Sequence, residues 1–238
     1  MGTDRPRVFL FDIDGTLLHG GGLSVESYCS AFTHIFGEPY SIRAVDCSGR
    51  TDPWIVRAVL RHYGLTEFAE DGSILEEIFR HFLTAMRAMV DAGYQAEVLP
   101  GVREALDFLG STPGVTRALL TGNLKEGARL KLQAAELLQY FGEESFALGA
   151  FGSDHHERER LAAIALDRLR HALGDSLQAR DVWIVGDSIH DISCARAAGF
   201  RVLAVASGST PRAELADKNP DILIDALDVG IFRRILHM

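Results

Sequence analysis

The chain has 238 residues, of which 47% are hydrophobic and 24% are charged, and its formal net charge is −9. This composition is typical of a soluble globular protein with one large domain or two small ones. The acidic charge argues against general nucleic-acid binding, which needs a basic face, but it allows a small anionic substrate if a local cation offsets it. We expect no nucleic-acid partner, and the sequence leaves open whether the protein is a monomer or a homodimer.

The same properties argue against a membrane or secreted protein. No apolar stretch approaches the ~18 residues that a transmembrane helix needs. The polar segment Met1–Arg7 leads directly into the first apolar run, which is unlike a signal peptide. Cys29, Cys47 and Cys194 lie far apart and form no CxxC spacing, as expected for reduced thiols. We therefore expect a cytoplasmic protein without membrane contact.

The first predicted element is Val8–Phe11, an apolar run without Gly or Pro that is typical of a strand buried on both faces. Asp12 and Asp14 follow it, and because side chains alternate along a strand, both project to the same side. Gly15 permits a turn and Thr16 adds a hydroxyl beside the pair. Two neighbouring carboxylates repel each other, so we expect a cation between them or a raised pKa on one. An ordinary Asp-Gly turn would explain Asp14 but not Asp12.

The next segment has a different character. Ser24–Gly93 follows the glycine run Gly20–Gly22 and carries amphipathic helical patterns without a convincing strand. It is long enough to form a small all-helical domain. We therefore predict a helical domain of residues 19–97 inserted after the first strand.

After the insert, predicted strands and helices alternate, which indicates a parallel sheet with helices on both faces. The later strands are predicted at Thr116–Leu120, Phe146–Phe151, Val182–Val185, Val202–Val205 and Ile222–Ile224. Right-handed crossovers place the carboxyl ends of all these strands at one edge, where open α/β sheets bind ligands. The predicted fold is a Rossmann-like α/β core of residues 1–18 and 98–238, interrupted by the helical domain.

Two polar clusters near the predicted strand ends could bind an anion. Thr121, Gly122 and Asn123 lie between a strand and a helix, where a hydroxyl and free backbone N–H groups favour a phosphate. The alternative is that Thr121 or Asn123 only caps the helix. In a second cluster, before a later helix, either Arg158 or Arg160 could supply a fixed cation.

Acidic residues at another strand end could bind a metal ion. Asp187 lies at the tip of a predicted strand and Asp191 one helical turn later, so both could face one point, although the helix dipole also explains Asp191. Together with Asp12 they offer the oxygen ligands that suit Mg²⁺. A carboxylate nucleophile that forms an aspartyl-phosphate would divide a difficult phosphoryl transfer into two easier steps.

Three motifs resemble those of the haloacid-dehalogenase-like (HAD) superfamily. The run FDIDGT resembles its first motif, hhhDxDGT, which implies Asp12 as the nucleophile and Asp14 as the general acid/base. The run LTGN resembles the second motif, which implies that Thr121 binds the transferred phosphoryl group. The run GDSIHD resembles the fourth, GDxxxD, which implies that Asp187 binds Mg²⁺ and that Asp191 lies in or next to its coordination shell. By the same resemblance, the backbone carbonyl of Asp14 also contacts the metal.

The resemblance extends over nearly the whole chain, with one departure. A helical insertion after the first motif resembles subfamily I, the phosphoglycolate-phosphatase-like members with a helical cap. The third motif is usually a lysine, but Phe151–Leu161 contains none. Arg158 stands where that cation is expected, and we predict it in the role in preference to Arg160. Because a guanidinium is a planar fork and an ammonium a compact charge, the geometry around the phosphate must differ.

The resemblance also favours one reaction over its relatives. Asp14 could protonate a leaving alkoxide, whereas dehalogenating relatives lack an acid at this position. Phosphonatases of the superfamily use a lysine of the cap, and Ser24–Gly93 contains no lysine. Burial beside Asp12 is expected to raise the pKa of Asp14 while Mg²⁺ holds Asp12 ionised.

The leading hypothesis is a Mg²⁺-dependent phosphatase that hydrolyses a small phosphorylated metabolite; the alternatives are a sugar phosphomutase of the same superfamily and a non-catalytic phosphate-binding or interaction module. Closure of the cap over the strand ends is expected to set specificity. Within the cap, Arg50 and Thr51 are candidate substrate-binding residues, unless Thr51 or Asp52 only caps the following helix. Gly20–Gly22 and Gln95–Pro100 are the expected hinges.

Overall fold

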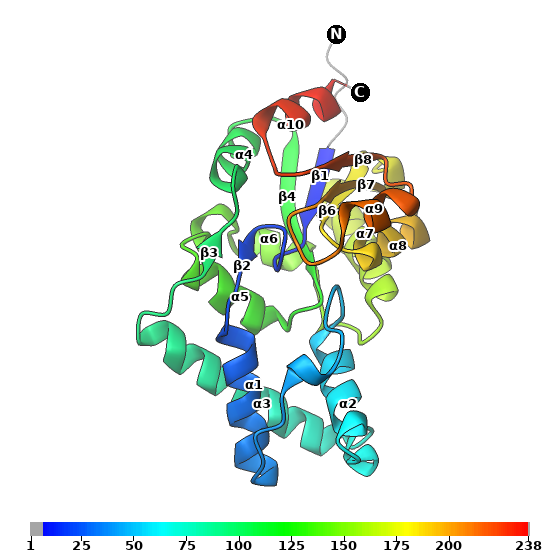
Figure 1. Cartoon of the computed structure of the whole chain (residues 1–238). Helices are drawn as coiled ribbons and strands as arrows, with labels where there is room; N and C mark the ends of the chain where they lie inside the picture. The colour runs from blue at the N-terminus through cyan, green and yellow to red at the C-terminus, as the bar shows by residue number, and fades with distance from the viewer. Residues whose placement is uncertain (1–6, 238) are drawn as a thin grey trace.

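The apolar run before the first aspartate forms a central strand of a six-stranded sheet. The computed structural model describes residues 7–237, and the strand order is β5-β4-β1-β6-β7-β8, with every neighbouring pair parallel. The strands are β1 (Arg7–Phe11), β4 (Val115–Thr121), β5 (Ala150–Phe151), β6 (Val182–Gly186), β7 (Arg201–Val205) and β8 (Ile222–Ile224). This sheet, with helices on both faces (Figure 1), confirms the predicted α/β fold class.

The alternation of side chains along β1 builds the two layers of the core. Phe9 and Phe11 face one apolar cluster, whereas Val8 and Leu10 face another on the opposite side of the sheet. The first cluster is covered by α4 (Val102–Gly110), α5 (Lys125–Ala134) and α10 (Val229–Leu236). The second is covered by α7 (Arg158–Leu173), α8 (Ile189–Ala198) and α9 (Arg212–Asp217). Because β1 is covered on both faces, its carboxyl end is held rigidly at the edge of the sheet.

One predicted strand is wrong for most of its length. Residues predicted as the strand Phe146–Phe151 instead form α6 (Glu143–Leu148), followed by the short strand β5. A short apolar run has no periodicity that separates a buried helix turn from a buried strand. Gly149 marks the junction, and a Cβ there would collide with the backbone of Leu119. The parallel pairing of β5 with the end of β4 nevertheless keeps this segment at the edge of the sheet.

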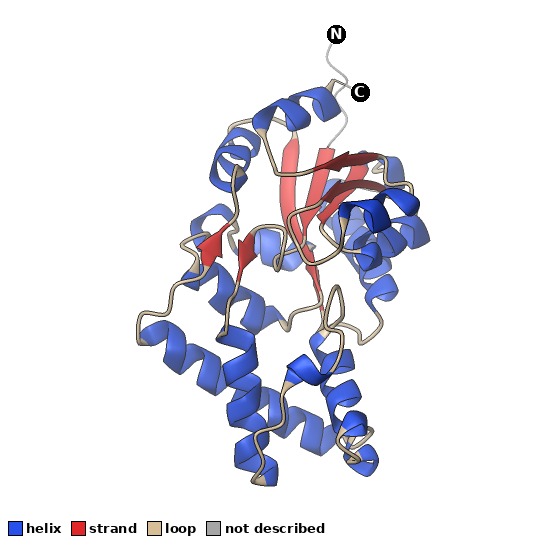
Figure 2. Ribbon diagram, in the orientation of Figure 1, coloured by secondary structure: helices blue, strands red, loops and turns tan. Residues whose placement is uncertain are grey.

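The chain between β2 (Leu18–His19) and β3 (Glu97–Val98) contains only helices, turns and loops, and we call residues 20–96 the helical insert. Its α-helices are α1 (Leu23–Phe36), α2 (Asp52–His62) and α3 (Gly72–Asp91). Figure 2 shows this group of helices beyond the carboxyl ends of the sheet. The strands β2 and β3 pair antiparallel, so the two connections to the insert run side by side.

The helical insert shares a third apolar cluster with α5. Leu130 and Ala134 of α5 belong to this cluster with residues of α1, α2 and α3, whereas Ala128 and Leu132 face the sheet. The helix α5 therefore lies between the insert and the sheet and is buried against both.

Three further expectations concern the N-terminal segment, membrane-spanning helices and the cysteines. Residues 1–6, which carry most of the polar N-terminal segment, and residue 238 lie outside the described residues. Between residues 7 and 237, no helix has both the length and the apolar character needed to cross a membrane. The three cysteines are free thiols, and Cys194 is buried.

Candidate active site

Three neighbouring strands deliver polar side chains to one edge of the sheet. Asp12 directly follows β1, Thr121 is the last residue of β4, and Asp187 directly follows β6. The backbone N–H of Asp12 still donates to the carbonyl of Val185 (2.9 Å), so the sheet hydrogen bonding continues up to the aspartate. The parallel register of β4, β1 and β6 therefore brings residues more than sixty positions apart in the sequence to one place.

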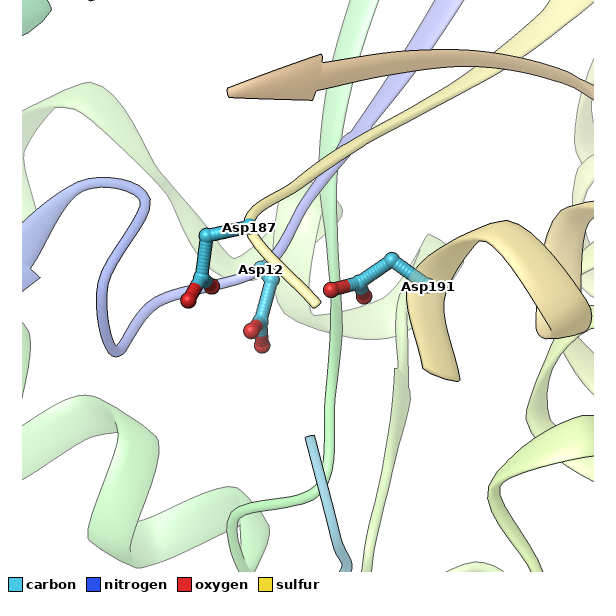
Figure 3. Close-up of side chains that lie close together, drawn as sticks. All are labelled: Asp12, Asp187 and Asp191. Carbon is cyan, nitrogen blue, oxygen red and sulfur yellow. The ribbon is translucent and has the colours of Figure 1, made fainter. Parts of the chain in front are cut away.

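Asp12, Asp187 and Asp191 form a cluster of buried carboxylates (Figure 3). One oxygen from each lies within 4.8 Å of the others, and the side chains point toward a common space. Burial, together with the neighbouring charges of Asp12 and Asp191, raises the pKa of Asp187 to about 8. Burial also raises the pKa of Asp12 to about 6, against the opposing charge of Arg158. Hard oxygen donors that are buried this closely fit a divalent cation such as Mg²⁺.

Small residues leave room for the Asp187 carboxylate. Gly15 has a φ of +78°, and a Cβ on either Gly15 or Gly208 would collide with this carboxylate. The hydroxyl of Thr16 donates to Asp187 Oδ1 (3.1 Å), which fixes its orientation. The turn at the end of the first motif therefore orients Asp187 in the acidic cluster and also reverses the chain.

Arg158 lies beside the acidic cluster, as the motif order predicted. Its guanidinium is paired with Asp191 and lies 3.3 Å from Asp12 Oδ1, and the side chain is 4% exposed. Asp191 also accepts from the backbone N–H (3.0 Å) and hydroxyl (2.6 Å) of Ser188. Arg160 is 70% exposed and pairs with Glu157 instead. Of the two candidate arginines, the structure brings only Arg158 to the aspartates.

Asp14 lies in the opposite electrostatic environment. Its Oδ2 accepts from Lys131 Nζ (2.6 Å) and from Asn123 Nδ2 (2.8 Å), and Lys131 also donates to Asn123 Oδ1 (2.6 Å). Partial burial works to raise the pKa of Asp14, but the charge and hydrogen bond of Lys131 outweigh it, so the pKa is lowered. The expectation of a raised pKa on Asp14 was therefore wrong, and it is Asp12 whose pKa is raised.

Lys131 was missed because it lies in no recognised motif. It follows Asn123 by eight residues and is buried on α5 between Ala128, which faces the sheet, and Ala134, which faces the insert. A lysine among buried small residues of a helix that starts just after a polar strand end is a usable signal, since charged residues are almost never buried without a partner.

The predicted anion site after β4 is largely engaged within the protein. The Thr121 hydroxyl accepts from Asn123 Nδ2 (2.8 Å), and Asn123 contacts Asp14 and Lys131 as described. The carbonyl of Gly122 accepts from the backbone N–H of Asp52 (2.7 Å), which joins the strand end to the helical insert. Asn123 therefore positions other site residues in this arrangement.

A cavity of about 360 Å³ joins the site to the helical insert. Its core side includes Asp12, Asp14, Gly122, Asn123, Lys131, Arg158 and Asp187, and its insert side includes Ser24, Tyr28, Cys47, Arg50, Asp52 and Ile55. The residue types on the insert side are mixed, whereas those on the core side are mostly charged or polar. A small molecule held there would contact both parts of the chain.

The two candidate residues of the insert differ in their surroundings. The Arg50 guanidinium lies 4.3 Å from the Trp54 ring, and Arg50 lines the cavity. Thr51 is the N-cap of α2, where its hydroxyl accepts from Trp54 N (3.2 Å) and donates to the carbonyl of His156 (2.5 Å). Asp52 is the first residue of α2 and accepts from the backbone N–H of Leu124 (2.7 Å). Thr51 and Asp52 therefore both hold the insert against the core.

Fold and site together define an α/β enzyme with an acidic centre at its strand ends. The family model for haloacid dehalogenase-like hydrolases matches residues 6–199, and the chain belongs to this family. The family predicted from the motifs is thereby confirmed.

Individual relatives cover nearly the whole chain. Phosphoglycolate phosphatase 1 of Pseudomonas aeruginosa is 28% identical over 228 residues, which cover 94% of this chain and 78% of the relative. A predicted phosphoglycolate phosphatase from Haemophilus somnus has a TM-score of 0.67 and 20% identity, with 98% of both chains covered. A putative β-phosphoglucomutase from Bacteroides vulgatus has a TM-score of 0.68 and 19% identity, with 99% of this chain and 90% of the other covered. These two solved structures share the fold.

Proposed function

We propose that the protein is a Mg²⁺-dependent phosphatase that hydrolyses a small phosphorylated metabolite through an aspartyl-phosphate on Asp12. The observation that carries this proposal is the position of Asp12, which lies beside Asp187, Asp191 and Arg158 and lines a cavity that Asp14 also lines. A homologue that covers 94% of the chain is named a phosphatase, which supports the same reaction. Oxygen ligands and a fixed cation around one carboxylate are what phosphoryl transfer requires.

The proposed metal ligands are Asp12, Asp187 and the backbone carbonyl of Asp14, with Asp191 in or next to the coordination shell. Bound Mg²⁺ would neutralise the phosphoryl oxygens and keep Asp12 ionised. Both Asp191 oxygens already accept hydrogen bonds, from Arg158 and Ser188, so we assign Asp191 chiefly to holding Arg158 in place.

In the first step, a carboxylate oxygen of Asp12 attacks phosphorus and the bond from phosphorus to the ester oxygen breaks. Asp14 gives its proton to the leaving alkoxide. Lys131 favours the ionised form of Asp14, and the approach of an anionic phosphate ester favours the protonated form, because like charges repel. Thr121 and Arg158 hold the transferred phosphoryl group in this proposal.

In the second step, Asp14 takes a proton from water and the resulting hydroxide oxygen attacks phosphorus. The bond between phosphorus and Asp12 breaks, which releases phosphate and restores the carboxylate. The ion pair with Lys131 suits this step, because it favours the ionised Asp14 that must act as a base. One water is consumed in each turnover.

We also propose that residues 19–97 act as a cap domain over a core of residues 1–18 and 98–238. Supporting this division, the helical insert lies beyond the carboxyl ends of the strands and lines the cavity. Arg50 is the proposed substrate contact from the cap, because it lines the cavity, and Thr51 and Gly122 are proposed to shape the adjoining wall. Closure over the cavity would exclude water from the reacting phosphoryl group.

The proposal is tested by Asp12→Asn, with Mg²⁺-dependent release of phosphate from p-nitrophenyl phosphate as the measurement. We expect turnover to fall by about 10³-fold or more, because the amide is a poor nucleophile. Asp167→Asn, at an exposed position on α7, is the matched control and should retain full turnover. Retained turnover in Asp12→Asn with an intact fold would rule out the aspartyl-phosphate.

Product analysis then separates the phosphatase from the phosphomutase. A panel of phosphorylated metabolites should include phosphoglycolate, the substrate named for the relative from Pseudomonas aeruginosa. A phosphatase releases inorganic phosphate from its best substrate, whereas a phosphomutase produces an isomeric sugar phosphate without net release. Our proposal requires stoichiometric release.

A further inference from the structure

Tyr28 places a buried hydroxyl group in the wall of the cavity. The residue lies on α1, its side chain is 0% exposed, and its ring stacks on Phe82 with a centroid distance of 3.8 Å. Among residues 7–237 no group meets the hydroxyl with good hydrogen-bond geometry, although the carboxylate of Asp52 lies close enough to shift its pKa. The ring is therefore fixed by packing, while its polar atom has an unused hydrogen-bonding capacity inside the protein.

The carboxylate of Asp52 lies close to this hydroxyl, so that each affects the pKa of the other, and Asp52 also lines the cavity. It is 6% exposed, and its Oδ2 accepts from the backbone N–H of Leu124 (2.7 Å), which leaves Oδ1 available. Burial first, and the charge of Asp52 second, raise the pKa of Tyr28, so the phenol stays protonated and able to donate. The insert side of the cavity thus presents one donor and one acceptor next to each other.

An unsatisfied buried hydroxyl is costly, and it is rarely kept without a ligand or water to satisfy it. A hydroxyl group of a ligand can accept from Tyr28 and donate to Asp52 at the same time. A carboxylate of a ligand could only accept, and it would lie against the charge of Asp52. As its own ligand, this pair therefore favours a hydroxyl group over an anionic group.

The proposed phosphatase reaction determines which part of the substrate this is. The phosphoryl group must lie at Asp12, on the core side, so the insert side receives the leaving group. We propose that Tyr28 and Asp52 are specificity-determining residues which bind a hydroxyl group of the leaving group, so that the substrate is a phosphate monoester of a small polyhydroxylated molecule. This inference rests on the proposed phosphatase activity.

The test compares esters that differ only in hydroxyl groups: glycerol 3-phosphate against propyl phosphate, and glycerol 2-phosphate against isopropyl phosphate. We expect the wild type to show a higher kcat/KM for the hydroxylated member of at least one pair. Tyr28→Phe removes one oxygen and keeps the stacked ring, so that preference should fall by about tenfold. Tyr63→Phe, at an exposed tyrosine at the end of α2, should leave the preference unchanged.

A second variant tests the charge. Asp52→Asn keeps an acceptor and removes the negative charge, so kcat/KM for phosphoglycolate should rise relative to that for the preferred hydroxylated ester. Thermal unfolding is measured for both variants. Tyr28→Phe should unfold at the wild-type temperature or above it, because no internal hydrogen bond is lost.

Three results would overturn the inference: no preference for hydroxylated esters in the wild type, the same preference in Tyr28→Phe, or a drop of several degrees in the unfolding temperature of Tyr28→Phe. Each would show that the hydroxyl has another partner or none. The proposed function is judged separately by Mg²⁺-dependent turnover of p-nitrophenyl phosphate in the wild type. If that turnover is present and the preference is absent, only the inference fails.

Discussion

Asp12 and Asp14 are two residues apart, yet the two halves of the site around them differ in charge. Asp12 lies among buried carboxylates with a single arginine, and burial raises its pKa to about 6. Asp14 is held by a lysine and an amide, and its pKa is lowered. The two carboxylates of one motif therefore differ in pKa because of partners on α7 and α5, which are far away in the sequence.

The spacing of two paired carboxylates therefore does not by itself assign their roles. The half around Asp12 has more negative than positive charge and so favours a divalent cation. The half around Asp14 is balanced without a metal, because Lys131 supplies the opposing charge. We expect substitutions in the first half to change metal binding and stability together, and those in the second to change mainly turnover.

Removal of Arg158 should have the largest effect. Arg158→Met leaves Asp12 and Asp191 buried without their cation, so the free energy of unfolding of the metal-free protein should fall by about 3 kcal/mol or more. Turnover of p-nitrophenyl phosphate should fall by about 10³-fold. Urea unfolding and steady-state kinetics measure the two effects.

Arg160→Met is the matched control, because Arg160 lies two residues away and is 70% exposed. It should change stability by less than about 0.5 kcal/mol. Equal losses in the two variants would contradict the position of Arg158 beside Asp12.

Asp187→Asn should reveal the raised pKa of Asp187 as a dependence of stability on pH. The folded pKa is about 8 against an ordinary value of 3.8, so the folded protein holds this proton more tightly than the unfolded chain does. The stabilisation that comes from this tighter proton binding is fully present below pH 3.8 and is lost as the pH rises through about 8. In EDTA, the variant should therefore gain a few kcal/mol relative to the wild type across this range. Urea unfolding at each pH measures the difference.

Mg²⁺ should reduce the advantage in stability that Asp187→Asn has over the wild type. At 100 times its dissociation constant, a ligand of the folded state adds about 2.7 kcal/mol, and this gain should appear in the wild type and not in Asp187→Asn. An equal Mg²⁺ effect on both proteins would place the metal elsewhere.

Lys131→Met should affect turnover more than stability, because the Asp14 side chain that it leaves unpaired is 44% exposed. We expect kcat to fall by about 10²-fold, with partial recovery in Lys131→Arg. Because the pKa of Asp14 is lowered by folding, its ionised form stabilises the wild type above the pKa of the unfolded chain. This stabilisation is lost as the pH falls. The stability difference between wild type and Lys131→Met should therefore shrink in acid, opposite in direction to that of Asp187→Asn.

Asn123→Ala should give the smallest effect of the series. It removes neutral hydrogen bonds to Asp14 and Thr121 but leaves the ion pair between Lys131 and Asp14. A loss of about 1 kcal/mol in stability and about tenfold in kcat is expected, measured as for Lys131→Met. A loss larger than that of Lys131→Met would show that Asn123, and not the lysine, controls Asp14.

The fold was predictable where sequence patterns are long and regular. The apolar runs of β1, β6 and β7 are strands in the structure, since continuous apolar residues bounded by polar ends have few other interpretations. The prediction of a strand at Phe146–Phe151 failed because a helix turn and a short strand adjoin within one apolar run. The two-residue pairing of β2 with β3 has no periodicity to detect.

Within the site, the strand-end residues could be located from the sequence because their position follows from topology. Asp12, Thr121 and Asp187 needed only a parallel sheet to be brought together. Lys131 and Tyr28 could not be found in this way. Their importance depends on how α5 and α1 are rotated and packed, which depends on the whole apolar cluster between the insert and the core.

The position of α5 between two apolar clusters has a consequence for recombination among relatives. Leu130 and Ala134 pack on the helical insert, whereas Ala128 and Leu132 pack on the sheet, and Lys131 lies between them in the sequence. An insert transplanted from a relative at the paired strands β2 and β3 would meet an α5 shaped for another partner. Chimeras that exchange the insert together with α5 should therefore fold more readily than chimeras that exchange the insert alone.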